Sequence, residues 1–167
     1  VGVGAVVDVA ESVLTAASDG SGLEARSVLF GWRPAGTSAG NAWECTEVSR
    51  GIKHLHADRI TCMSVAMGAR GPLLATGSRD KTVKLWAGVG IGGEGERKEP
   101  WHVIETLKGH TDWVNCLAGV HVQETQTPLL VSGSRDRSLR VWTGKARKGS
   151  EGELAWECSG VFKGGEM

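Results

Sequence analysis

Short runs of alternating apolar and polar residues recur along this 167-residue chain, and clusters of turn residues separate them. In the clearest stretch we expect strands over 101–107, 113–118, 129–134 and 138–142, because these segments are alternating or rich in β-branched residues. None of the four is long enough to suggest a helix. The pattern predicts an all-β chain in which short strands are joined by turns.

The same runs return in the same order, which indicates an internal repeat. Residues 73–88, LLATGSRDKTVKLWAG, align without a gap to residues 129–144, LLVSGSRDRSLRVWTG. Upstream of each lies a second matching phrase, HADRITCMSV from His56 and HTDWVNCLAG from His110. A third pair is WECTEVSRG and WECSGVFKG, and a fainter copy of the repeat occupies the first 40 residues. The chain is therefore expected to be a stack of similar modules.

Composition narrows the classes of function. The 25 glycines fit strands joined by turns, and the 19 basic and 19 acidic residues leave no net charge to attract nucleic acid or an anionic membrane over a long range. The opening apolar stretch, 1–10, has no basic region before it and is too short to cross a bilayer. We expect neither a signal peptide nor a membrane span.

The cysteines and histidines do not form a metal-binding pattern. The four cysteines contain no CxxC pair, which argues against a zinc site and a dithiol redox centre. Cys62 and Cys116 share a place in successive repeats, and we expect both to be small residues of a crowded core. His54 and His56 have an HxH spacing, but we expect His54 to be a surface histidine. We predict no metal and no cofactor.

Two of the repeats resemble the WD-repeat family, whose units have a Gly-His pair near the start and a Trp-Asp pair at the end. One unit here has Gly109–His110 and ends at Trp142–Thr143. The preceding unit has His56 without the glycine and ends at Trp86–Ala87, so both final aspartates are replaced, as they often are in the family. The resemblance implies a β-propeller, with blades of four antiparallel strands and about three blades in this chain.

On this basis the whole chain, 1–167, is predicted to be one propeller segment. Its parts are a degenerate blade at 1–42, a second blade at 43–100 with a glycine-rich insertion, a third blade at 101–155, and a spare outer or closing strand at 156–167. Complete propellers have about four to eight blades. We therefore expect either a larger parent chain or two copies that join into a six-bladed ring. If neither occurs, exposed strand edges would make the chain prone to self-association.

The resemblance also implies a hydrogen-bond relay in each blade. An indole only donates, a hydroxyl passes the hydrogen bond on, and a histidine links that hydroxyl to a carboxylate in a tight turn. A Ser, a His and an Asp also suggest a hydrolase, but repetition in successive units favours a structural device. The relay residues would be His56, Thr76, Asp80 and Trp86 in one unit, and His110, Ser132, Asp136 and Trp142 in the next.

In the family, function resides at the rim of the central opening, where turns from successive blades meet. Exposed Arg and Trp often dominate the binding energy of interfaces. Two arginines there would suit an acidic or phosphorylated partner. The alternative for Trp113 is that it packs in the core. The rim residues that the resemblance implies are Arg59, Thr61, Arg79, Trp113, Asn115 and Arg135.

The leading hypothesis is an intracellular scaffold, cytoplasmic or nuclear, that presents a rigid propeller surface to other proteins or peptides and is not an enzyme. The alternative is nucleic-acid binding through a local basic cluster. Against this alternative, no aromatic residues are interleaved with the basic ones to stack bases. The cluster consists of Arg137, Arg140, Lys145, Arg147 and Lys148.

Overall fold

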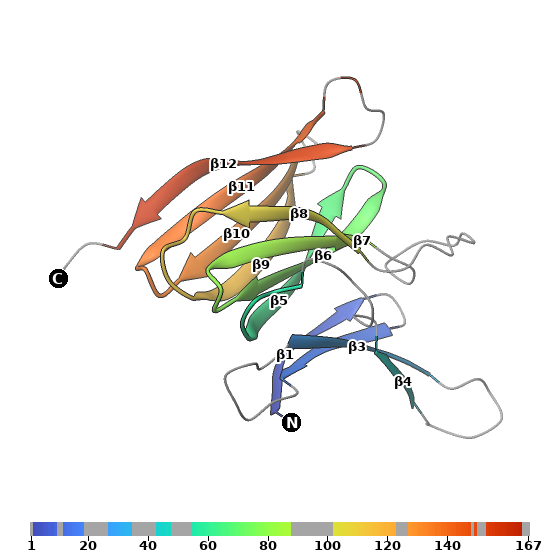
Figure 1. Ribbon diagram of the computed structural model, residues 1–167. Helices are drawn as coiled ribbons and strands as arrows, with labels where there is room; N and C mark the ends of the chain where they lie inside the picture. The colour runs from blue at the N-terminus through green and yellow to red at the C-terminus, as the bar shows by residue number, and fades with distance from the viewer. Residues whose placement is uncertain are drawn as a thin grey trace.

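The fold is all-β, as the sequence predicts. The computed structural model describes residues 2–9, 12–18, 27–34, 43–47, 55–87, 102–122, 127–147, 149 and 153–164, and these residues contain twelve strands and no helix (Figure 1). The strands are β1 Gly2–Val9, β2 Ser12–Ser18, β3 Ser27–Pro34, β4 Trp43–Glu47, β5 Ile60–Gly68, β6 Gly71–Ser78, β7 Thr82–Ala87, β8 His102–Lys108, β9 Val114–Val122, β10 Thr127–Ser134, β11 Ser138–Ala146 and β12 Leu154–Lys163.

The strands form three sheets of four. Each sheet is a meander of consecutive antiparallel strands, with the orders β1-β2-β3-β4, β5-β6-β7-β8 and β9-β10-β11-β12. We call them the first, second and third sheets. The prediction of blades of four antiparallel strands, about three in this chain, is confirmed. The arguments below concern the second and third sheets, for which side chains are described.

The sheets begin one strand later than the predicted units. β4 pairs with β3, β8 pairs with β7, and β12 pairs with β11. The expected boundaries at 43 and 101 therefore fall at or just before the last strand of the first and second sheets, and the boundary at 156 falls within β12. The strand predicted within 156–167 begins at Leu154 and is the outer strand of the third sheet, where it forms a ladder with β11 from Ala146↔Leu154 to Ser138↔Lys163. This pairing satisfies backbone groups of β11 that would otherwise lie at an open edge.

The second and third sheets pack against each other through one apolar core. β5 lies against β9, the first strand of the third sheet, and Val114 of β9 is fully buried. The Thr61 hydroxyl donates to the carbonyl of Val114, and the Gly119 amide donates to the Ser64 hydroxyl at 3.0 Å. The contact combines apolar burial with hydrogen bonds between the sheets. The buried cluster consists of Ala66, Leu73, Ala75, Val83, Leu85, Leu107, Val114, Leu130, Trp142 and Trp156.

The far face of the third sheet lacks this cover. In the second sheet the paired residues Val83 and Leu107 are 0% and 4% exposed. The equivalent pair in the third sheet is Leu139 and Phe162, which are 47% and 62% exposed. The same two positions of the repeat are thus buried in the second sheet, which the third sheet follows, and exposed in the third sheet.

Matching turns connect the two middle strands of these sheets. Lys81 and Arg137 adopt left-handed backbone conformations, with φ of 71° and 63°. Their amides donate to the carbonyls of Ser78 and Ser134, each at 3.2 Å. Residues with a side chain seldom adopt this conformation. Its occurrence at the same place in both repeats indicates that the turn geometry is part of the module.

Candidate functional site: a buried relay and an exposed Arg-Trp-Arg rim

In the second sheet four side chains form a continuous hydrogen-bonded chain. Trp86 Nε1 donates to Thr76 Oγ1 at 2.7 Å, and Thr76 Oγ1 lies 2.8 Å from His56 Nε2. His56 Nδ1 lies 2.8 Å from Asp80 Oδ2. Since the indole only donates and the carboxylate only accepts, the threonine hydroxyl donates to Nε2 and the imidazole Nδ1–H donates to the aspartate.

The third sheet repeats this arrangement atom for atom. Trp142 Nε1 donates to Ser132 Oγ at 2.8 Å, and Ser132 Oγ lies 2.8 Å from His110 Nε2. His110 Nδ1 lies 2.9 Å from Asp136 Oδ2. All eight residues that the repeat pattern implies are therefore brought together, four in each sheet.

Each relay ends in a carboxylate that also fixes the turn. Burial alone would raise the pKa of Asp80, but hydrogen bonds from His56 and Thr82 outweigh it and hold the pKa well below its usual range. The pKa of Asp136 is lowered against burial in the same way, by hydrogen bonds from Ser138, Thr111 and His110. Both aspartates therefore remain ionised at neutral pH.

The hydroxyls of Thr82 and Ser138 are members of the network that the sequence reasoning missed. Each donates to the carboxylate of the aspartate two residues earlier at 2.6 Å and lies 3.3 Å from the histidine Nδ1. The signal was available, since both repeats carry a hydroxyl residue at this position of the turn. It was overlooked because a hydroxyl in a turn is common for other reasons.

The Ser132–His110–Asp136 chain has the order of a hydrolytic triad, but not its accessibility. Ser132 is 0% exposed and His110 is 7% exposed. The serine oxygen already accepts a hydrogen bond from the buried Trp142 indole and donates its proton to His110. A nucleophile must reach its substrate, and this arrangement instead suits a structural network.

At the edge of the two sheets, Trp113 lies against two arginines. The guanidinium carbon of Arg79 is 4.1 Å from the centre of the Trp113 ring, and that of Arg135 is 4.7 Å from it. Both distances are within the range of a cation–π contact. Trp113 is half-buried, so it belongs neither wholly to the core nor wholly to the surface.

Backbone hydrogen bonds hold this rim in place. The Arg79 amide donates to the carbonyl of Arg59 at 3.0 Å, and the Arg135 amide donates to the carbonyl of Trp113 at 2.8 Å. The Arg135 Nε lies 3.8 Å from a carboxylate oxygen of Asp112, with both side chains substantially exposed. This acidic neighbour of the rim was not among the predicted residues, although both repeats carry an aspartate at this position, Asp58 and Asp112.

The other three predicted rim residues differ in their exposure and in their contacts. Arg59 and Asn115 are exposed, and Thr61 is half-buried. The Thr61 hydroxyl donates to the carbonyls of Gly77, at 3.1 Å, and of Val114. Thr61 therefore serves the contact between sheets, whereas Arg79, Trp113 and Arg135 form the compact part of the rim.

The two cysteines expected in the core differ. Cys62 is partly buried against the third sheet, and burial raises the pKa of its thiol to about 11. Cys116 is exposed, so its expected burial is wrong. It lies on the uncovered face of the third sheet, where no described strand plays the part that β9 plays for Cys62. Cys158 is also exposed; the side chain of Cys45 and the residue His54 lie outside the part that is described.

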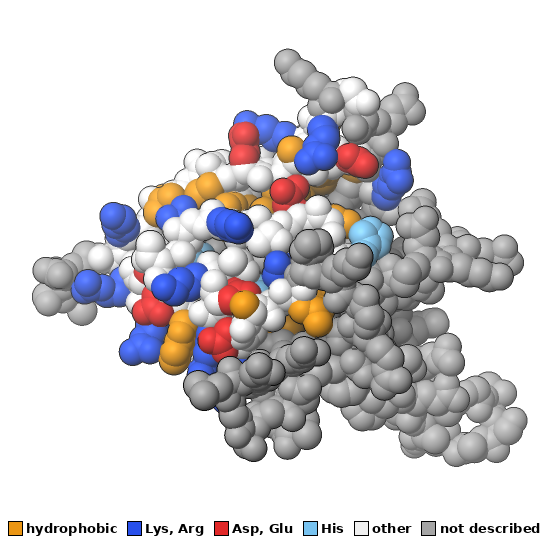
Figure 2. Space-filling model, in the orientation of Figure 1, with side chains coloured by type: hydrophobic (Ala, Val, Ile, Leu, Met, Phe, Trp, Pro, Cys, Tyr) orange, Lys and Arg blue, Asp and Glu red, His pale blue; other side chains and the backbone are white. Residues whose placement is uncertain are grey.

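Two basic residues of the alternative nucleic-acid cluster are paired with acids. Lys145 contacts Glu157, and Arg147 lies 3.6 Å from Glu153. Figure 2 shows basic and acidic side chains interspersed over the described part of the face in view. Lys148 lies outside the described residues. Among the described residues there is no cluster of three His, Cys, Asp or Glu that could hold a metal, and no helix fit to span a membrane.

Repeated four-stranded meanders, with a Trp–hydroxyl–His–Asp relay in both the second and the third sheet, define a β-propeller repeat protein. The family model "WD domain, G-beta repeat" matches residues 49–87 and 101–143. The chain therefore belongs to the WD-repeat family.

Two relatives of this chain are considerably longer than the chain itself. The chain is 32% identical over 133 residues to the "Probable cytosolic iron-sulfur protein assembly protein 1" of Chaetomium globosum, covering 73% of this chain and 27% of that protein. It is 31% identical over 121 residues to the "Nuclear distribution protein PAC1" of Arthroderma otae, covering 68% of this chain and 24% of that protein. The chain thus spans about a quarter of the length of these relatives.

The fold is also found in solved structures. The crystal structure of Chaetomium thermophilum Sqt1 bound to the N-terminus of the ribosomal protein L10 superposes with a TM-score of 0.66 at 18% identity. The match covers 96% of this chain and 37% of that one. At this identity the likeness establishes the propeller fold.

Proposed function

We propose that this chain is part of a protein-interaction scaffold and that its rim, Arg79, Trp113 and Arg135, binds an acidic or phosphorylated segment of another protein. The observation that carries the proposal is the placement of two guanidinium groups over one indole ring. Stacking on the ring restricts the arginines while leaving donors in their planes for an oxyanion. Trp and Arg are also the residues that most often dominate interface energies.

Rigidity supports this role. Arg79 and Arg135 occupy equivalent positions in two turns, each fixed by a backbone hydrogen bond to the neighbouring loop. Asp80 and Asp136 of the buried relays fix these turns, because each carboxylate accepts a hydrogen bond from the amide two residues later. A surface held in this way loses little conformational entropy when a partner docks.

Two further observations favour binding over the alternatives. The relay serine is fully buried, which argues against a hydrolase, and two of the basic loop residues are already paired with acids, which argues against a nucleic-acid site. We propose that the chain is not catalytic. Its relatives include a protein named for cytosolic assembly and a protein named for nuclear distribution, which supports an intracellular location.

A pull-down of acidic and phosphorylated peptides tests the rim directly. Reversing its charge with Arg79→Glu plus Arg135→Glu should abolish capture, because both guanidiniums then repel the ligand. The matched control is Lys81→Glu plus Lys108→Glu, which changes the net charge equally at two exposed residues of the second sheet. Equal capture by both double variants would exclude the rim. Retention on RNA that falls steeply with salt would support the nucleic-acid alternative instead.

We also propose that two copies of the chain associate through the far face of the third sheet. The support is the exposure of Leu139 and Phe162, whose counterparts Val83 and Leu107 are buried under a neighbouring sheet. Sedimentation should reveal a dimer or a larger species, and Leu139→Glu plus Phe162→Glu should return it to a monomer. A well-folded monomer of the unaltered chain would refute self-association.

A further inference from the structure

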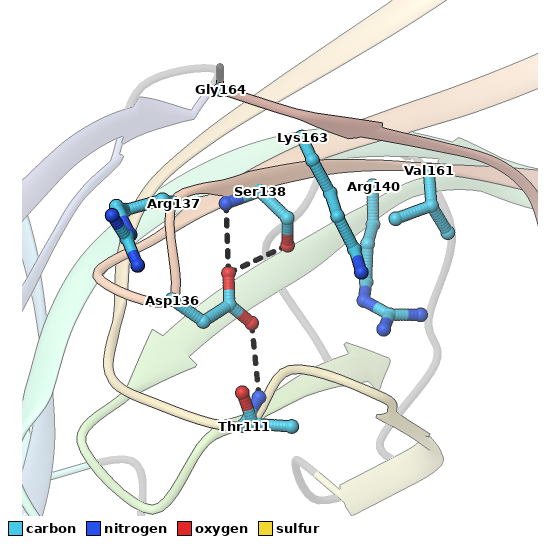
Figure 3. Close-up of a pocket in the computed structure, with 8 residues that line it drawn as sticks. All are labelled: Thr111, Asp136, Arg137, Ser138, Arg140, Val161, Lys163 and Gly164. Atoms are coloured by element: carbon cyan, nitrogen blue, oxygen red, sulfur yellow. Dashed lines mark hydrogen bonds between the residues drawn. The ribbon is translucent and has the colours of Figure 1, made fainter. Parts of the chain in front are cut away.

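A pocket of about 340 Å³ lies beside the turn between β10 and β11 (Figure 3). Its walls come from this turn, from strands β11 and β12, and from Thr111 in the preceding loop. It is adjacent to the rim, since Arg135 precedes the turn residues Asp136 and Arg137. No function has been attached to it so far.

The pocket carries an excess of positive charge. Arg137, Arg140 and Lys163 line it, and Asp136 is the acid in its wall. That carboxylate already accepts hydrogen bonds from the Thr111 amide at 2.9 Å and from the Ser138 amide and hydroxyl at 2.9 and 2.6 Å, besides the one from His110. The Asp136 carboxylate is therefore already hydrogen-bonded within the relay and the turn.

Arg140 and Lys163 belong to neighbouring strands and reach the same side of the pocket. Arg140 pairs with Val161, and Ser138 pairs with Lys163, so the two basic residues are diagonal neighbours on one face of the sheet. Figure 3 shows both side chains extending from the strands in the same direction. Two like charges held close together favour an anion between them.

Neither cation has an acidic partner among the described residues. The Nε of Arg140 is buried without a hydrogen-bond partner, and its Nη1 has only a weak contact with Cys158 Sγ at 3.7 Å. Lys163 is exposed and forms no ion pair within the described part of the chain. A buried donor without a partner is costly, and a ligand oxygen would satisfy it.

The second sheet shows that this arrangement is not a general property of the module. At the position of Arg140 it has Lys84, which is 7% exposed and donates to Thr106 at 3.1 Å. Thr106 is the register partner of Lys84, whereas the register partner of Arg140 is Val161. In the third sheet an aliphatic side chain thus takes the place of the hydroxyl acceptor, so the Arg140 guanidinium remains available to a ligand.

We propose that this pocket binds a phosphate monoester, presented by a phosphorylated side chain of a protein partner. Three basic residues and one acid give the pocket an excess of positive charge, which suits a phosphate of charge about −1.5 to −2 better than a carboxylate of charge −1. A phosphate also offers three acceptor oxygens, enough for Arg140 and Lys163 together. The proposal does not depend on the rim, since the pocket would bind phosphate whether or not Arg79 and Trp113 bind a peptide.

The test is a titration of the ¹⁵N-labelled chain with inorganic phosphate at low ionic strength, following the amide signals of Thr111 and Gly164 beside the pocket. Saturable shifts are expected with phosphate and not with acetate at the same ionic strength. Lys163→Met and Arg140→Gln should each weaken binding about tenfold or more, the effect of losing one charge-assisted hydrogen bond. N-acetyl-phosphoserine amide should bind at least as tightly as inorganic phosphate.

The internal repeat supplies the matched control. Lys108 is the counterpart of Lys163 in the second sheet, so Lys108→Met removes the same charge and should leave phosphate binding unchanged. The amide signals of Thr111 and Gly164 report on the pocket and peptide capture reports on the rim, so the two proposals can fail separately. Because Lys163 and Lys108 are both exposed, neither variant should unfold the chain. Equal affinities of the Lys163→Met and Lys108→Met variants, or equal shifts with acetate and phosphate, would overturn the proposal.

Discussion

Val114 of the third sheet occupies the space that a side chain at Gly77 of the second sheet would need. A Cβ atom added to Gly77 would lie 2.7 Å from Val114 Cγ1 and 2.6 Å from Cys62 Sγ. The absence of a side chain at this one position allows β9 to approach the second sheet closely. The contact between the sheets therefore depends on a glycine as much as on the apolar residues around it.

Gly77→Ala is expected to lower the free energy of unfolding by about 1–3 kcal/mol, because the added methyl overpacks this contact. Gly133→Ala is the matched control in the third sheet. There the atom nearest the added Cβ is Sγ of Cys116, which is exposed and can turn into solvent. Urea unfolding of both variants measures the difference, and an equal loss in the two would contradict the packing argument.

Ser132→Ala should also destabilise the third sheet, by about 1–3 kcal/mol, because the buried Trp142 indole loses its acceptor and His110 loses its donor. Ser132→Thr should restore most of the loss, since Thr76 performs the same task in the second sheet. Thermal unfolding of both variants gives the comparison. If alanine were tolerated as well as threonine, the relay would not contribute to stability.

The lowered pKa values of the two relay aspartates lead us to expect that acid destabilises the fold. The pKa values of Asp80 and Asp136 are depressed in the folded state, so their contribution to stability is fully present above the unfolded pKa of about 4. It is lost as the pH falls through the folded values. Unfolding free energies measured from neutral pH downward should therefore decline below about pH 4. The Asp136→Asn variant should be less stable at neutral pH and show a shallower decline.

Thiol labelling should distinguish the cysteines. Burial raises the pKa of Cys62 to about 11, so little thiolate forms at neutral pH, whereas Cys116 and Cys158 are exposed. An aromatic disulfide reagent should modify the two exposed thiols in the native protein and Cys62 only after denaturation. Mass spectrometry of the digested protein locates the labels. Equally fast modification of Cys62 and Cys116 would mean that β9 does not cover the second sheet.

What lies within one module was largely accessible from the sequence. The repeat of LLATGSRDKTVKLWAG and LLVSGSRDRSLRVWTG fixes the strands and the turn, and the relay residues meet because both strands and the turn hold them in register. Contacts between modules were not accessible. The stacking of Arg79 of one sheet and Arg135 of the next on the same Trp113 ring depends on how two sheets face each other.

The same reason explains the error over Cys116. The repeat gives Cys62 and Cys116 identical surroundings within their own sheets, and only the neighbouring sheet makes them differ. The pocket at Arg140 was missed for a related reason. Its available cation depends on the pairing of Arg140 with Val161, where the second sheet pairs Lys84 with the hydroxyl residue Thr106. Such pairings become visible only when the register of the outer strand is known.

The uncovered pair Leu139 and Phe162 has a consequence for how this chain must be handled in solution. Any molecule that buries these side chains binds the folded form and not the unfolded one, so it shifts the folding equilibrium by mass action. If the covering molecule is a second copy, as proposed above, a melting temperature measured on a dilute sample should be lower than one measured on a concentrated sample. Stability becomes a quantity that has meaning only when the protein concentration is stated beside it.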